Sequence, residues 1–173
     1  MQRFDAGWAL WDPEKDELAW WGDLGVDDMA DVTSLAPAGE SLVYALIGRG
    51  DHLLTAGAPP IAPRLALIDP RKREMVSIAE LPEEFGAISW HGHHSLRVAP
   101  NGYVYGATAY TIFRIIPGTT EVERVWQVDE PEPRLGVWMT SLSPNSIDGP
   151  IVDYQMFCST GWRLRSITLP PGE

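Results

Sequence analysis

The chain has 173 residues, of which 45% are apolar and 21% charged, and its 24 acidic against 13 basic residues give a net charge of −11. This length suits one ordinary domain, and the composition is that of a globular chain rather than a disordered one. The negative charge repels phosphate backbones and excludes a general nucleic-acid role, and no apolar stretch approaches the ~20 residues that span a bilayer. A single cysteine, Cys158, excludes an internal disulfide framework, so we expect a cytoplasmic location if the chain is complete.

A strand that ends in a proline-bearing turn and returns as a second strand recurs three times along the chain. The three turns are marked by Pro13, Pro70 and Pro117, and apolar returns follow at 18–21, 75–78 and 122–128. Such a pair is the signature of a β-hairpin. The prolines lie 57 and then 47 residues apart, a spacing that brackets the length of a four-stranded propeller blade and predicts an array of like units.

A second repeated turn lies between these hairpins. The segment 34–39 leads into the apolar run 42–47, the segment 97–102 leads into 103–107, and 141–145 leads less cleanly into 151–154. Asn-Gly between apolar runs, as at Asn101-Gly102, is the strongest short hairpin signal because both central residues must adopt positive φ. Joining the two features gives a unit of four strands, in which strand one ends at this second turn and strand three ends at the proline turn.

We therefore predict an all-β fold with two complete four-stranded blades and two partial ones, all within one domain, 1–173. The units cover about 7–25, 32–82, 96–128 and 139–169. The first unit holds only strands three and four, and the last holds strands one and two with a third at 162–169. A loop rich in proline and glycine, 48–64, expands the second unit.

The segment 98–106, with its Pro100-Asn101-Gly102 turn, and the segment 112–117 resemble the blade repeat of β-propellers of the NHL, streptogramin-lyase and gluconolactonase type. The resemblance covers 32–128 well and implies a partial β-propeller. It implies less about activity, because propellers host unrelated functions. In streptogramin-lyase-like propellers a histidine precedes this strand and magnesium is bound; His93 or His94 stands in the matching place, but 103–110 lacks the glutamate of that pattern. Gluconolactonase-like propellers bind a divalent metal through residues of separate blades.

The number of units is too small for a closed ring. Propellers close with about 4–8 blades, and an open arc leaves apolar faces and strand edges in water. We therefore expect either missing blades from a longer chain or self-association. Two copies would give a ring of about six or seven blades.

The connections from strand four of one unit to strand one of the next fall at 25–31, 83–94 and 129–138. In a propeller these connections lie on one face beside the central channel, and such mouths are where ring-like folds usually bind ligands. The three segments are rich in carboxylates and imidazoles, so they predict an acidic funnel. The residues predicted to bind a ligand are Asp27, Asp31, Trp90, Glu130 and Trp138.

Residues 90–95 hold three of the four histidines of the chain. His91, His93 and His94 are the candidate catalytic residues, and His93, Asp31 and Glu130 are candidate ligands of a divalent metal, because imidazole and carboxylate groups suit such ions. Adjacent strand residues point to opposite faces, so all three histidines cannot share one metal. The alternative is that one histidine packs at the channel rim, hydrogen-bonded to the backbone, while the others are solvated.

Eight tryptophans also invite two interpretations. Trp11 and Trp126 fall inside repeated strands and are expected to pack between blades. Trp90 and Trp138 occupy loops near the predicted mouth, where an aromatic face can stack on a sugar ring or another flat ligand.

The function that these features favour is a non-catalytic binding or interaction platform, with a small molecule, a glycan or a protein partner at the acidic, histidine-containing funnel. The alternative is part of a metal-dependent lyase or lactonase-type hydrolase, in which the histidines serve as base or metal ligand. A third possibility is the structural closing portion of a larger propeller.

Overall fold

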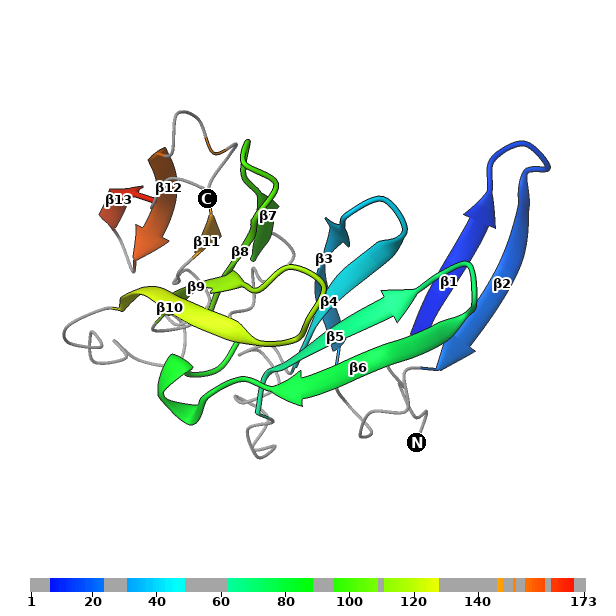
Figure 1. Ribbon diagram of the computed structural model, residues 1–173, viewed down its shortest axis with the longest axis horizontal. Helices are drawn as coiled ribbons and strands as arrows, with labels where there is room; N and C mark the ends of the chain where they lie inside the picture. The colour runs from blue at the N-terminus through cyan, green and yellow to red at the C-terminus, as the bar shows by residue number, and fades with distance from the viewer. Residues whose placement is uncertain are drawn as a thin grey trace.

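The computed structural model describes residues 7–23, 31–48, 62–88, 95–108, 111–127, 146–147, 151, 155–160 and 163–169, and the structural statements below refer to these. The fold is all-β (Figure 1), and in these ranges the one helix is the single 3-10 turn η1 (Glu83–Phe85). None of the described segments forms a helix with the length and apolarity to cross a membrane.

The strands form four antiparallel sheets, each in chain order. A two-stranded sheet contains β1 (Gly7–Asp12) and β2 (Glu17–Asp23). Two four-stranded sheets contain β3 (Asp31–Ala38), β4 (Leu42–Gly48), β5 (Arg64–Asp69) and β6 (Glu74–Glu80), and then β7 (Leu96–Val98), β8 (Val104–Ala107), β9 (Thr111–Ile115) and β10 (Val122–Gln127). A three-stranded sheet contains β11 (Ser146–Ile147), β12 (Gln155–Thr160) and β13 (Arg163–Thr168). The predicted all-β fold with two complete four-stranded units and two partial ones is therefore confirmed.

Of the strand expected at 151–154 only Ile151 is described, and it lies outside any strand; the second strand of that sheet is β12, Gln155–Thr160. Met156 faces its partner Ile167 on β13 and is fully buried, and Ile151 packs into the same cluster. Ile151 is thus a core residue although it does not belong to a strand.

The two Asp-Pro turns are built alike. Asp12 Oδ1 accepts hydrogen bonds from the backbone N–H groups of Glu14 and Lys15, at 3.0 and 3.3 Å. Asp69 Oδ1 accepts the equivalent bonds from the backbone N–H groups of Arg71 and Lys72, both at 3.0 Å. An aspartate that bonds its own backbone in this way defines an Asx-turn. In each turn the carboxylate also pairs with a lysine, and the fourth residue after the aspartate has positive φ: 55° at Asp16 and 61° at Arg73.

The third proline turn lacks this aspartate, because Ile116 occupies the equivalent position. A side chain from the neighbouring sheet completes it. The Tyr44 hydroxyl, on β4, accepts a hydrogen bond from Gly118 N at 2.9 Å and donates one to Ile116 O at 3.4 Å. This pair of bonds ties the two four-stranded sheets together.

Three of the strands at the edges of the sheets contain a one-residue irregularity. On β2, β6 and β10 the pairing skips Ala19, Val76 and Val125 respectively. An extra residue of this kind bends the strand and increases its twist.

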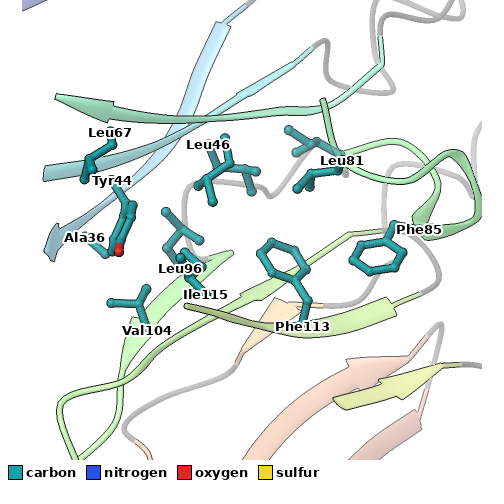
Figure 2. Packing of buried hydrophobic residues seen from close by; sticks show 12 residues of the cluster. Ala36, Tyr44, Leu46, Leu67, Leu81, Phe85, Leu96, Val104, Phe113 and Ile115 are labelled. Carbon is teal, nitrogen blue, oxygen red and sulfur yellow. The ribbon is translucent and has the colours of Figure 1, made fainter. Parts of the chain in front are cut away.

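The two four-stranded sheets pack face to face over a shared apolar core (Figure 2). Tyr44, Leu46 and Leu67 of the first sheet meet Leu96, Phe113 and Ile115 of the second. A second core lies between β7–β10 and β11–β13. Because both faces of β8 and β9 are covered, these central strands are almost continuously buried, as strands with two packed faces are.

The sheets are arranged as an open row. The first strands β3 and β7 are neighbours, and Leu96 N donates to Ser34 Oγ at 3.1 Å across them. In Figure 1 the β1–β2 hairpin and the β11–β13 sheet stand at opposite ends of the row. The described strands therefore form a fan of sheets that does not close into a ring.

Candidate functional site

One end of the two four-stranded sheets carries the long connections. Asp31 pairs with Gly48, and Arg64 pairs with Glu80, at this end of the first sheet. Ser95, Thr108, Thr111 and Gln127 mark the corresponding end of the second. We call it the loop end, and the end with the short proline and glycine turns the turn end.

Of the predicted site residues, the structure places Asp31, which begins β3 at the loop end. The others lie outside the described residues: Asp27, Trp90, His91, His93, His94, Glu130 and Trp138. The described residues that flank these segments in the sequence lie at the loop end. Ile88 and Ser95, both almost fully buried, bracket the histidine segment, and Gln127 closes β10 shortly before Glu130.

Buried hydroxyl groups concentrate at the loop end. Thr108 Oγ1 donates a hydrogen bond to Phe85 O at 2.5 Å, which holds the η1 turn against the end of β8. Ser34 Oγ accepts from Leu96 N, as described above. The hydroxyls of Ser95 and Thr111 are buried and have no hydrogen-bond partner among the described residues. Sequence alternation does not single out these side chains, because serine and threonine are equally common in exposed strand positions.

The exposed side chains at the loop end are largely acidic. Glu83 and Glu84 are exposed on η1, while Phe85 of the same turn is buried and its ring stacks on Phe113 at 5.8 Å. Arg64 Nη2 lies 3.4 Å from Glu80 Oε1. The two η1 carboxylates are thus presented by a turn that the core anchors.

A polar cluster that the sequence did not reveal lies on the face of β7–β10 that packs toward β11–β13. Arg114 Nε donates to Glu123 Oε2 at 3.1 Å, and its guanidinium carbon lies 4.7 Å from the centre of the Tyr103 ring. The hydrogen bond that Arg114 donates to Glu123 raises the pKa of Arg114. Beside it, burial raises the pKa of Tyr105, while Asn101 and Arg114 near its hydroxyl oppose that rise without completing a well-formed hydrogen bond among the described residues. The one sequence signal was Arg114, a charged residue inside an otherwise apolar strand.

Within the described ranges, no three His, Cys, Asp or Glu side chains are grouped so that they could hold a metal ion. The histidines proposed as ligands fall outside those ranges. Comparison with protein-family models, with curated proteins and with solved structures finds no match to this chain.

Proposed function

We propose that this chain is a segment of a β-propeller of the NHL, streptogramin-lyase and gluconolactonase-like type, and that it acts as a non-catalytic binding platform. The ligand or partner is taken at the loop end. Its chemistry is cationic or polyhydroxylic: a basic protein surface, a glycan or a small molecule of that kind.

The observation that carries this proposal is the contrast between the two ends of the sheets. At the turn end the connections are short and are stabilised internally, as in the Asx-turns of Asp12 and Asp69. At the loop end four connections, 24–30, 49–63, 81–95 and 128–145, are much longer, while 108–110 and 161–162 are short. Long connections on a rigid scaffold are where binding residues usually lie.

Charge supports the chemical class of the ligand. Asp31 and Glu80 stand at the strand ends, Glu83 and Glu84 are exposed on η1, and the whole chain carries a charge of −11. A surface of one sign attracts partners of the opposite sign and raises their association rate. The fan of face-packed sheets is the arrangement that propeller blades adopt, which supports the fold assignment.

The test uses two probes that match the two ligand classes, an octalysine peptide in titration calorimetry and an array of oligosaccharides. The double substitution Glu83→Gln with Glu84→Gln is expected to weaken octalysine binding about threefold to tenfold, since each exposed charge contributes modestly. Trp90→Ala with Trp138→Ala is expected to reduce glycan binding if the ligand is a sugar.

A matched control places the same change at the turn end. Glu14→Gln with Glu17→Gln removes two exposed carboxylates there and should leave both kinds of binding unchanged. The proposal is contradicted if binding falls with the Glu14 and Glu17 changes but not with the Glu83 and Glu84 changes. It is also contradicted if the chain binds neither octalysine nor any oligosaccharide.

A further inference from the structure

At the turn end, the connection between β7 and β8 carries a chemical reactivity that the proposed function does not use. Asn101-Gly102 is the only asparagine–glycine pair in the chain, and Asn145 is the only other asparagine. The backbone nitrogen of a residue after asparagine can attack the side-chain amide carbon. Glycine at that place leaves the nitrogen unshielded, because it has no side chain.

Two hydrogen bonds hold Asn101 in this turn. Its Oδ1 accepts from Tyr103 N at 3.2 Å, and the ring that this bond closes includes the Gly102 nitrogen. The Tyr103 N–H also polarises the side-chain carbonyl, and a donor in that place stabilises the negative charge that develops on the oxygen during attack. Gly102 is exposed, has a φ of 84° and donates its N–H to Ala99 O at 2.9 Å. That bond must open before the nitrogen attacks, so the fold slows the reaction relative to the unfolded chain.

The surroundings of Asn101 suit the product better than the amide. Because Oδ1 is turned to Tyr103, the amide nitrogen Nδ2 is the group that is buried without a hydrogen-bond partner among the described residues. The Tyr105 hydroxyl, which is also buried and unpaired, lies near this side chain. An amide nitrogen can only donate, whereas a carboxylate oxygen in its place would accept the Tyr105 O–H. A hydrogen bond to an ionised group is about twice as strong as a neutral one.

The charges around Tyr105 also favour a carboxylate. Its cross-strand partners are Arg97 on β7 and Arg114 on β9, and residues that pair directly across strands share one face of the sheet. Glu123 forms an ion pair with Arg114. Two guanidinium groups face one carboxylate in this described row, so its balance of charge is positive. An opposite charge nearby stabilises the ionised form of a carboxyl group.

We propose that Asn101 is a site of spontaneous deamidation, and that the aspartate formed there fastens the 99–102 turn to β8. The Gly102 nitrogen bonds to Asn101 Cγ, the bond from Cγ to Nδ2 breaks, and ammonia leaves with the proton of the Gly102 amide. Water then adds at Cγ, and the bond from Cγ to the Gly102 nitrogen breaks. This restores the main chain and leaves a carboxyl group that ionises. Water is the only co-reactant, and nothing is oxidised or reduced.

The ring can also open at the backbone carbonyl, which gives isoaspartate. That product lengthens the main chain inside the turn closed by Gly102 N and Ala99 O. The fold therefore favours aspartate.

The first test incubates the folded full chain in mildly alkaline buffer and maps its peptides by mass spectrometry, with chromatography to separate aspartate from isoaspartate. We expect Asn101 to convert to aspartate, more slowly than in the same chain unfolded in urea, where isoaspartate should dominate. The proposal is overturned if Asn101 stays intact in the folded chain over a period that converts Asn145, or if isoaspartate is the main folded-state product.

The second test introduces the product directly. Asn101→Asp should raise the melting temperature by about 2–4 °C, the shift that one added hydrogen bond gives in a chain of this length. In a Tyr105→Phe background the same substitution should give no gain, because the donor is absent. A lower melting temperature, or an equal gain in both backgrounds, would refute the stabilising contact. Octalysine binding at the loop end should not change with Asn101→Asp, so this inference and the proposed function can fail independently.

Discussion

Replacing Gly106 by alanine is expected to destabilise the fold because the ring of Phe113 occupies the space of the missing side chain. Gly106 on β8 and Phe113 on β9 are direct cross-strand partners. An ideal Cβ on Gly106 would meet three ring carbons of Phe113, and even the farthest would be 2.8 Å away, whereas ordinary contacts begin at 3.4 Å. Gly106 is not among the glycines with positive φ, so the effect is steric alone.

The size of the effect follows from what surrounds the ring. Phe113 is fully buried and stacks on Phe85, so the ring has little room to withdraw. Overpacking in a dense core costs about 1–3 kcal/mol, and we expect about 2–3 kcal/mol here because the obstacle is a rigid ring. For a chain of this length that lowers the melting temperature by about 4–12 °C.

Urea unfolding followed by tryptophan fluorescence measures the change, and the slope with denaturant should stay constant. Gly48→Ala is the matched control. Its Cβ would meet Ile88 Cδ1 at 2.6 Å and Cγ1 at 3.2 Å, but these atoms belong to a side chain that can rotate, unlike the Phe113 ring, so the cost should be about 1 kcal/mol, the low end for overpacking. Combining Gly106→Ala with Phe113→Leu should cost less than the sum of the two single changes, by about 1–2 kcal/mol. The reasoning fails if Gly106→Ala is no more destabilising than Gly48→Ala.

Three further predictions use the same urea and thermal measurements. Tyr44→Phe should cost about 1 kcal/mol, because it leaves the Gly118 N–H without its acceptor. Tyr105→Phe should be neutral or stabilising, because the hydroxyl it removes is buried without a partner in the described structure; a loss as large as that of Tyr44→Phe would contradict this. Asp69→Ala should lower the melting temperature most at neutral pH. The backbone N–H of Lys72, more than any other group, lowers the pKa of Asp69, so its carboxylate stabilises the fold above its ordinary pKa of 3.8. That contribution is lost as the pH falls through the lower folded-state pKa, so the difference from the unmodified chain should shrink in acid; a difference that grows would contradict the assignment.

Local turn chemistry made much of the fold predictable. Asp12 and Asp69 bond to backbone groups two and three residues ahead, so the residue type and its neighbours suffice to locate those turns. Strands that border such a turn, such as β5 just before Pro70, were found for the same reason. In the last unit Ile151 was misjudged because apolar character alone does not distinguish a strand residue from a core residue beside a strand.

Contacts between distant parts of the chain could not be read in the same way. The hydroxyl of Tyr44 reaches a turn 72 residues ahead, and the Phe113 ring lies over Gly106 only because of the register between two strands. The candidate site is the least predictable part. Of its residues only Asp31 has a described position, and the buried hydroxyls of Ser95 and Thr111 become visible only when burial is known.

The skipped residues on β2, β6 and β10 have a consequence for how this protein behaves at high concentration. An outermost strand with straight, regular spacing is a template on which further chains can stack into fibrils. Ala19 on β2, Val76 on β6 and Val125 on β10 each interrupt that spacing once. Val76 is an exposed apolar residue, but it lies at a point where the regular pairing of β6 is broken. Along β2, β6 and β10 the addition of a further strand is thereby made less favourable.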